Sequence, residues 1–304
     1  MNLKYEKTEK QRLDSYLAEI TADMSRSHIT GLIKSGQITV NGKTQKAGYM
    51  LCENDEIFFP EEKPHEVDIR PEDIPLDIVY EDNDLIIVNK PKDMVVHPAA
   101  GHYENTLVNA LMHHCRDSLS GINGELRPGI VHRIDKDTTG LIVACKNDRA
   151  HTKIAEQLAK HSITRRYVAL VNGVIREEEG VIDRNIDRSR SDRKKMAVTD
   201  TASGKTAVTH FRVLERFKEH TLVECRLETG RTHQIRVHMA SIGHPLAGDE
   251  IYGMKRDRLS GNGQYLHAKV LGLVHPTTGK YIEFSSELPD YFLETIQKLG
   301  KSAK

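Results

Sequence analysis

The sequence predicts an α+β protein in which a small helix–hairpin unit precedes a larger, largely antiparallel mixed sheet with helices packed on it. Two observations lead to this expectation. Short apolar runs with period-two alternation recur along the chain and read as strands joined in hairpins. An acidic stretch with repeated prolines separates the first 60 residues from the remainder.

Composition indicates a globular protein and leaves its partners open. The 304 residues are 38% hydrophobic and 29% charged, and Lys+Arg equals Asp+Glu at 44 each. Any nucleic-acid site must therefore come from local clusters of basic residues, because the net charge is zero. The sequence shows neither an 18-residue apolar span nor a signal-peptide pattern, so we expect a cytoplasmic protein without membrane contact.

Cysteine and histidine spacing gives no metal-binding pattern. The four cysteines are scattered without a CxxC pair, and we expect buried free thiols in a reducing compartment. His113, His114 and Cys115 are contiguous in a helical pattern, in which neighbouring side chains diverge by about 100°. They cannot converge on one ion, so no metal is expected.

Residues 1–60 form the first predicted unit. Apolar residues at 13, 16, 17 and 20 have helical spacing, and a second helix is expected from Ser25 or Ser27 to Gly36. A short strand at 37–40 then meets Asn41-Gly42, a strong hairpin signal.

Between Met24 and Met50 this unit carries basic residues and no Asp or Glu. The basic residues are Arg26, Lys34, Lys43 and Lys46. Four positive charges on a compact unit suit a phosphate backbone, and they equally suit an ordinary solvated face. Both interpretations stay open on these residues alone.

Residues 61–75 are predicted to be an extended linker, and residues 76–304 a second domain. That domain begins with a hairpin over 78–88 and a helix that Asn105 could cap. Asn147 is placed to cap another helix, and residues 163–171 alternate as a strand.

The segment 184–195 shows no periodicity and is strongly basic. It holds Arg184, Arg188, Arg190, Arg193, Lys194 and Lys195. A flexible basic loop and a loop that grips RNA are both consistent with this composition. After a strand at 221–228, Thr232 is placed to cap a helix that ends at Gly243.

The central feature of the domain is a polar segment, 132–140, that leads into the apolar run 141–145. Polar segments between core elements commonly carry chemistry. This one offers the carboxylates of Asp135 and Asp137. Asp-Thr-Thr-Gly is also ordinary turn chemistry, in which side-chain oxygens accept from backbone N–H groups.

The ten residues 132–141, His-Arg-Ile-Asp-Lys-Asp-Thr-Thr-Gly-Leu, resemble the signature loop of the RluA/RluD family of RNA pseudouridine synthases. The segments "TRRYVALVNG" and "LETGRTHQIRVHMASIGHPLAGDEIYG" resemble two further family motifs. Most of residues 10–60 resembles a small RNA-binding domain first described in a ribosomal small-subunit protein.

This resemblance implies an enzyme that isomerises uridine in RNA, with large-subunit ribosomal RNA or its precursor particle as the favoured partner. It implies that Asp135 is the nucleophile, that Tyr167 lies under the target base, and that Arg231 pairs with Asp135. Arg133 and the basic residues of both clusters would then hold RNA. The reaction moves no electrons and adds no group, so no cofactor is expected, and a monomer is the default.

Two other functions are consistent with parts of the sequence. An RNA-binding protein without catalysis would explain the basic clusters and leave Asp135 and Arg231 unused. A glycoside hydrolase would normally need two cooperating carboxylates. Asp137 could be the second carboxylate, although its threonine neighbours favour a structural role.

Overall fold

The chain divides into two compact units, Met1–Val67 and Asp68–Lys304. The computed structural model describes residues 2–21, 26–60, 69–98, 103–116, 118–124, 127–189, 192, 195–201, 203–254, 257, 259, 261 and 263–301. The division falls inside the segment predicted to be a linker. No helix among these residues is long and apolar enough to cross a membrane.

The first unit has two helices and short strands, as its apolar spacing predicts. The helices are α1 (Leu13–Ile20) and α2 (Arg26–Lys34). The strands are β1 (Asn2–Lys4), β2 (Gln11–Arg12), β3 (Thr39–Val40), β4 (Lys43–Thr44), β5 (Met50–Leu51) and β6 (Glu56–Phe58). Asn41 and Gly42 both have positive φ and make the predicted turn between β3 and β4. Apolar side chains of α1, α2 and the strands form the core of this unit.

The end of the predicted linker is packed rather than extended in solvent. Ile69 is buried, and the Glu72 backbone N–H donates to the Asn109 carbonyl oxygen at 3.0 Å. The Asn109 side chain in turn donates to the Arg70 carbonyl oxygen at 2.8 Å. Because backbone groups make these bonds, proline and acidic content alone did not reveal them. Residues 69–75 therefore belong structurally to the second unit.

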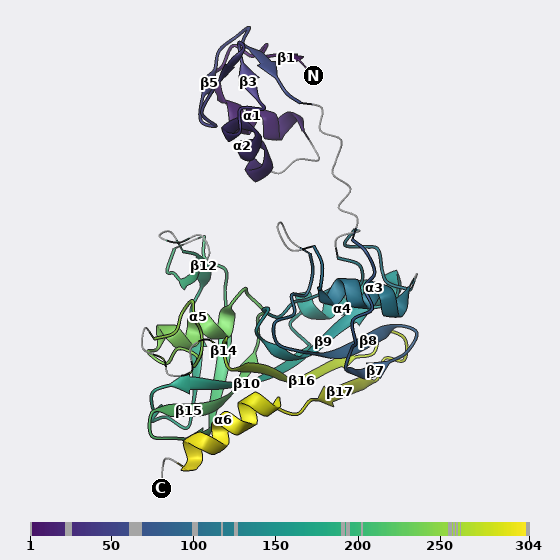
Figure 1. Ribbon diagram of the computed structural model, residues 1–304, viewed down its shortest axis with the longest axis vertical. Coiled ribbons are helices and arrows are strands. Elements are labelled where there is room, and N and C mark those ends of the chain that lie inside the picture. The colour runs from purple at the N-terminus through teal and green to yellow at the C-terminus, as the bar shows by residue number, and fades with distance from the viewer. Residues whose placement is uncertain are drawn as a thin grey trace. The chain divides into compact units, whose positions relative to one another are not determined.

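The second unit is built on a nine-stranded mixed sheet (Figure 1). Its main path runs β11-β14-β15-β10-β16-β9-β8-β7, and β17 pairs with β16. The strands are β7 (Ile78–Glu81), β8 (Leu85–Lys90), β9 (Thr139–Cys145), β10 (Thr164–Asn172), β11 (Glu179–Asp183), β14 (Val208–Arg216), β15 (His220–Leu227), β16 (Leu266–Val274) and β17 (Tyr281–Ser285). Only the β9–β16 pairing is parallel among the ladders of this sheet in the described residues, so the predicted largely antiparallel mixed sheet is confirmed.

Helices cover both faces of this sheet. Figure 1 shows α3 (Leu107–Cys115), α4 (Asp148–Ala159) and α5 (Gln234–Ser241) on one side and α6 (Asp290–Lys301) on the other. Val168 of β10 packs in the cluster that contains Phe292 of α6. Since side chains alternate along a strand, the neighbouring Tyr167 faces the opposite side.

Two of the predicted helix caps differ from the structure. Thr106, and not Asn105, caps α3: its side chain accepts from the Asn109 backbone N–H, and the side-chain oxygen of Asn109 accepts from the Thr106 backbone N–H. Asn147 caps α4 as predicted. The cap of α5 is described below with the site.

The described part of the basic segment 184–195 includes a strand that the sequence did not predict. Its described part forms β12 (Ile186–Arg188), which pairs antiparallel with β13 (Met196–Val198). Arg190, Arg193 and Lys194 lie outside the described residues. Two three-residue strands are too short to produce a recognisable alternation, which is why the sequence predicted a loop.

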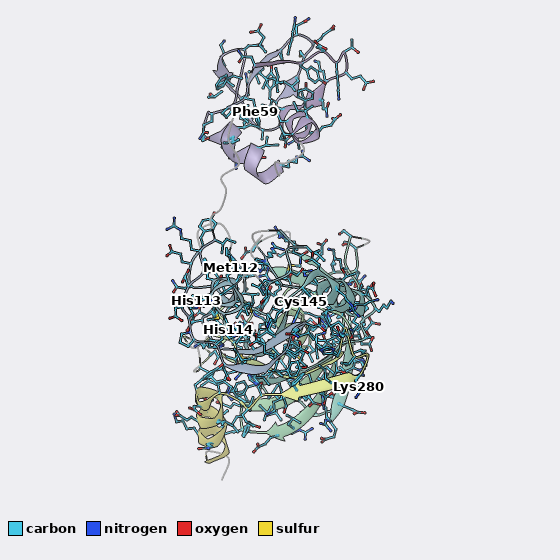
Figure 2. The ribbon with its side chains drawn as sticks, turned by 90° about the vertical axis from the view of Figure 1, so that its right-hand side faces the viewer. Phe59, Met112, His113, His114, Cys145 and Lys280 are labelled. Atoms are coloured by element: carbon cyan, nitrogen blue, oxygen red, sulfur yellow. The ribbon has the colours of Figure 1, made fainter. Side chains whose placement is uncertain are left out.

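Three of the four free cysteines are buried, as expected, but Cys52 is exposed. Figure 2 shows Cys145 among the side chains that fill the second unit, and His113 and His114 toward its edge. His114 lies 2.8 Å from Glu81, and Cys115 is buried. The side chains of this His-His-Cys run therefore diverge, as helical geometry predicts.

Candidate active site

Asp135 lies on the loop that precedes β9, and its carboxylate lines an open cavity of about 60 Å³. Several parts of the chain form its walls. The loop contributes residues 133–135 and Thr138, and strands β10, β15 and β16 contribute Tyr167, Leu227 and Leu266. The turn after β15 and the start of α5 contribute Arg231 and residues 233–236. The three segments "HRIDKDTTGL", "TRRYVALVNG" and "LETGRTHQIR" thus meet at one place on the sheet.

The loop that carries Asp135 is held on both sides by hydrogen bonds of polar side chains. The Lys90 ammonium donates to the Lys136 carbonyl oxygen at 2.8 Å, directly after Asp135. On the other side, the Val143 backbone N–H donates to Nε2 of His132 at 3.1 Å. Burial lowers the pKa of His132 to about 3, so its ring stays neutral and can accept this bond. Asp135 is therefore fixed in place by its neighbours in sequence.

Gly140 permits the parallel pairing that positions this loop. Its φ is +105°, and a Cβ there would lie 2.4 Å from the Ala268 carbonyl oxygen. Thr139 and His267 bond across the same strand pair at 2.8 Å. Only glycine allows β9 to approach β16 so closely at the end of the loop.

The Asp135 carboxylate is bonded to a buried arginine, Arg236 of α5. Nη1 of Arg236 lies 2.8 Å from Oδ2 of Asp135. The other side of the guanidinium forms a two-bond pair with Asp249, at 2.7 Å and 2.9 Å. Burial alone would raise the pKa of Asp249, but the bonds from Arg236 outweigh it and hold that pKa below its usual value. Arg236 is thus anchored by one carboxylate and presented to another.

The predicted pairing of Arg231 with Asp135 is wrong in this structure. Nε of Arg231 donates to the Thr206 carbonyl oxygen at 2.9 Å, although Arg231 lines the same cavity. The sequence contains a signal for Arg236: it lies three residues before the buried Met239, on the inward side of α5. The contact itself spans 101 residues and could not be read from spacing.

The junction before α5 differs from the predicted cap. Thr232 does not cap the helix; the N-cap is His233, whose backbone is left-handed at φ 56°. The Gln234 side chain accepts from the Arg231 backbone N–H at 2.9 Å and from the Thr229 hydroxyl at 2.8 Å. A glutamine inside the first turn therefore closes the turn that places Arg231 and His233 at the cavity.

His233 and Tyr252, which the sequence did not single out, complete the surroundings of Asp135. The Tyr252 hydroxyl accepts from the Met196 backbone N–H at 2.7 Å and is hydrogen-bonded to Nδ1 of His233 at 2.8 Å. Nε2 of His233 faces Oδ1 of Asp135 at 3.7 Å. Burial lowers the pKa of His233, which favours the neutral imidazole. Arg236 also lies over the Tyr252 ring, 5.1 Å from its centre.

Tyr167, which is predicted to lie under the target base, is in the wall of the Asp135 cavity. It is buried in β10 and lines the cavity together with Asp135. Burial raises the pKa of Tyr167, so the phenol stays protonated at neutral pH. An aromatic ring in the wall of a cavity can stack on a planar base.

The predicted RNA-binding residues are distributed over both units. Lys34, Lys43 and Lys46 are exposed in the first unit, whereas Arg26 is paired with Asp14 at 3.0 Å. In the second unit, the exposed basic residues include Arg133, at the cavity, and Arg188, in β12. Lys195 is half-buried before β13.

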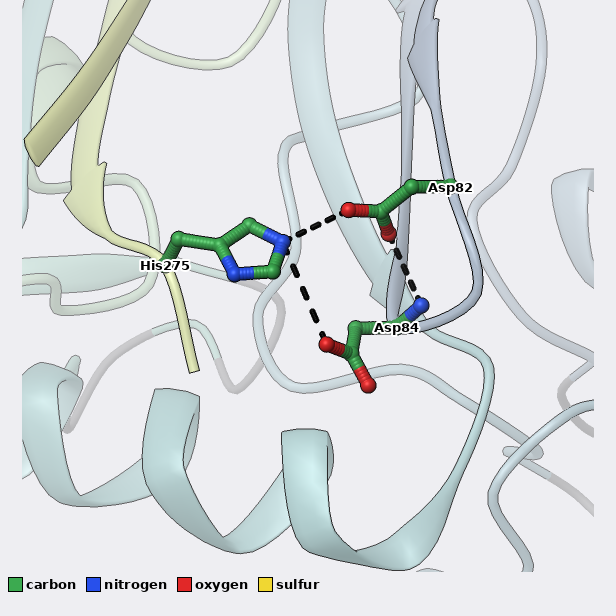
Figure 3. A group of neighbouring side chains, drawn as sticks. All are labelled: Asp82, Asp84 and His275. Atoms are coloured by element: carbon green, nitrogen blue, oxygen red, sulfur yellow. Dashed lines mark hydrogen bonds and ion pairs between the residues drawn. The ribbon is translucent and has the colours of Figure 1, made fainter. Parts of the chain in front are cut away.

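A second group of titratable side chains, Asp82, Asp84 and His275, joins two turns and is not arranged as a metal site (Figure 3). Nδ1 of His275 accepts from the backbone N–H groups of Thr277 and Thr278, both at 3.2 Å. The ring proton is therefore on Nε2, which lies 2.6 Å from Asp82. With both ring nitrogens used in this way, His275 offers no lone pair to a cation. The group ties the β7–β8 turn to the β16–β17 turn.

Comparison with solved structures identifies the class of fold. The chain is similar to "Human RNA Pseudouridylate Synthase Domain Containing 1", with a TM-score of 0.59 and 24% identity over 79% of this chain and 98% of that one. It is also similar to "Human RNA Pseudouridylate Synthase Domain Containing 4", with a TM-score of 0.57 and 25% identity over 73% of this chain and 92% of that one. The sheet and its helices thus have a pseudouridine synthase fold.

Sequence comparison then identifies the family. Residues 84–241 match the RNA pseudouridylate synthase family, and residues 11–57 match the S4 domain. An uncharacterized RNA pseudouridine synthase of Bacillus subtilis is 52% identical over 98% of this chain and 97% of its own length. Ribosomal large subunit pseudouridine synthase D of Zymomonas mobilis is 48% identical over 91% and 90%, and that of Escherichia coli is 44% identical over 94% and 90%.

The chain therefore belongs to the RNA pseudouridine synthase family and is an isomerase that acts on RNA. The matched segment 84–241 contains Asp135, Tyr167, Arg231 and Arg236. It ends before Asp249 and Tyr252, which hold Arg236 in this structure.

Proposed function

We propose that this enzyme isomerises specific uridines of large-subunit ribosomal RNA and that Asp135 is its nucleophile. The observation that carries the proposal is the Asp135 carboxylate in a cavity, held at 2.8 Å by an arginine that is itself fixed by Asp249. The choice of RNA rests on relatives that are named ribosomal large subunit pseudouridine synthase D. Such a substrate agrees with the expected cytoplasmic location.

The reaction exchanges one bond between base and ribose for another. The bond from C1′ to N1 breaks, the base turns, and a bond from C1′ to C5 forms. The proton on C5 leaves to solvent, and N1 gains a proton, so atoms and electrons balance without a cofactor. Asp135 supplies the electron pair that adds to the nucleotide and leaves again after the base has turned.

In this scheme Arg236 holds the Asp135 carboxylate in one orientation and places a positive charge beside it. In this scheme Tyr167, in the wall of the same cavity, stacks on the uracil ring and assists loss of the C5 proton. Arg231, which lines the cavity and does not pair with the nucleophile as predicted, contacts the RNA in this scheme.

The target uridine must leave its stack before it can enter this cavity. Unstacking costs a few kcal/mol, which contacts elsewhere on the RNA must offset. The exposed lysines of the S4-like unit, Lys34, Lys43 and Lys46, can supply such contacts, as can Arg133 and the β12–β13 segment. Recognition and chemistry are thus assigned to different residues.

The test uses transcripts that carry tritium at C5 of uridine, because isomerisation releases this atom to water. Large-subunit ribosomal RNA should release tritium with the wild-type protein, whereas small-subunit ribosomal RNA and transfer RNA transcripts should not. Release from transfer RNA alone would contradict the proposed substrate. Free uracil without tritium release would indicate a glycosidase, and binding without either product an RNA-binding protein.

A further inference from the structure

A second and larger cavity adjoins the one that contains Asp135. It has a volume of about 530 Å³, and the two share Arg133, Tyr167, Leu227 and Arg231 in their walls. The two cavities thus adjoin, and a strand of RNA whose base enters the first can place a neighbouring part of its backbone in the second.

The second cavity is positively charged. Its lining includes the guanidinium groups of Arg133, Arg165 and Arg231 and no carboxylate. Clefts lined by charges of one sign concentrate ligands of the opposite sign. The wall thus favours an anion.

Arg165 of β10 is the unusual member of this wall. It is only 7% exposed, yet its Nε has no hydrogen-bond partner among the described residues. The bond found for its other nitrogens, from Nη2 to the Glu228 carbonyl oxygen, is long at 3.5 Å. It also makes no salt bridge within the described part of the chain, whereas the equally buried Arg236 has two carboxylates. A buried cation without an anion is costly unless a ligand supplies one.

Gly230 leaves the space that the Arg165 guanidinium occupies. A Cβ at position 230 would lie 2.5 Å from Nη1 of Arg165, and both residues line the second cavity. The guanidinium therefore fits against the backbone at the wall of the cavity, and its Nε donor has no partner among the described residues.

We propose that this second cavity binds a backbone phosphate of the RNA, next to the uridine that enters the Asp135 cavity, and that Arg165 is its main ligand. A phosphate diester offers acceptor oxygens and a negative charge that match the guanidinium donors. The proposal rests on the proposed function, because it takes the strand at the first cavity to be the substrate RNA.

The experiment compares Arg165→Met with Arg166→Met. Arg166 is the neighbouring residue of the same strand, faces the opposite side, and is paired with Glu283 at 2.9 Å. Binding to a large-subunit ribosomal RNA transcript is measured across a series of salt concentrations, with Asp135→Asn also present in each protein so that no RNA is converted. Arg165→Met should weaken binding about tenfold or more and reduce the slope of log K against log salt by about 0.7. Arg166→Met should leave both unchanged.

A merely structural role for Arg165 would not change the salt slope, and an unchanged slope in a folded Arg165→Met protein would overturn the proposal. Arg165→Lys, which keeps the charge, should restore most of the slope. If Arg165→Met does not fold, the Asp135→Asn protein with Arg165 intact is tested with RNA in which one phosphate beside the target uridine is a neutral methylphosphonate. Neutralising the 5′ or the 3′ neighbour should weaken binding about tenfold, and no effect of either would overturn the proposal. Binding is read without turnover, so failure of tritium release would contradict the proposed function separately.

Discussion

The buried Asp249–Arg236–Asp135 arrangement predicts that stability and activity can be separated by mutation. Arg236→Met removes the cation and leaves the Asp249 carboxylate, which is 0% exposed, without its partner. Breaking a buried pair in this way should lower the free energy of unfolding by about 3–5 kcal/mol. That is a large share of the roughly 5–15 kcal/mol available to a folded protein.

Adding Asp249→Asn should recover stability without recovering activity. The double variant removes the unpaired charge, and the amide oxygen of the new side chain can still accept from the backbone N–H groups that now bond Asp249, those of Ile251 and Tyr252. We expect it to regain at least about 1–2 kcal/mol over Arg236→Met. Both variants leave Asp135 without its arginine, and both should lose about 10²-fold or more in turnover.

Urea unfolding followed by circular dichroism, and tritium release at a temperature where both proteins are folded, provide the two readings. Arg231→Met is the matched control, since it removes a cavity arginine that does not touch Asp135. A double variant no more stable than Arg236→Met would refute the electrostatic argument. A control that loses as much turnover as Arg236→Met, with RNA bound to saturation, would refute the assignment of Arg236.

Three other predictions follow from single positions. Gly140→Ala should lower the free energy of unfolding by about 3 kcal/mol or more, because the new Cβ meets the Ala268 carbonyl oxygen. Gly300→Ala, whose Cβ would meet nothing within 4 Å, should leave the unfolding temperature unchanged. Equal melting curves for the two variants would contradict this prediction. The pKa of His132 is about 3 in the folded protein and 6.5 ordinarily, so the unfolded chain binds more protons between these two pH values. The free energy of unfolding that neutral His132 contributes is therefore lost as the pH falls below 6.5. The unfolding free energy of wild type should therefore drop by about 2 kcal/mol more than that of His132→Gln between pH 7 and pH 5, and parallel profiles would exclude this role. A thiol reagent should label Cys52 quickly and the three buried cysteines only on unfolding; fast labelling of a second thiol would contradict the burial.

The sequence predicted well those features that depend on local periodicity and turn chemistry. Alternating apolar residues placed β10 and β15, and Asn41-Gly42 placed the β3–β4 turn, because each signal is contained within a few residues. Asp135 and Tyr167 were found through motif resemblance, and both line one cavity in the structure.

The sequence failed where the deciding contact is distant or made by an unexpected side chain. The pairing of Asp135 with Arg236 joins residues 101 positions apart, and the motif resemblance predicted Arg231 instead. The Thr232 cap failed because the Gln234 side chain satisfies the turn instead. Such choices between equivalent residues depend on three-dimensional packing, which spacing does not encode.

The role of Asp135 as nucleophile is tested by comparing tritium release by wild type, Asp135→Asn and Asp137→Asn on large-subunit ribosomal RNA. Asp137 is in the same loop but is not among the residues that line the cavity, so its variant is the matched control. We predict that Asp135→Asn binds RNA within about twofold of wild type and releases no tritium above the protein-free rate, whereas Asp137→Asn continues to release it. Continued release by Asp135→Asn, or a loss of RNA binding that equals its loss of release, would contradict the assignment of Asp135 as the nucleophile.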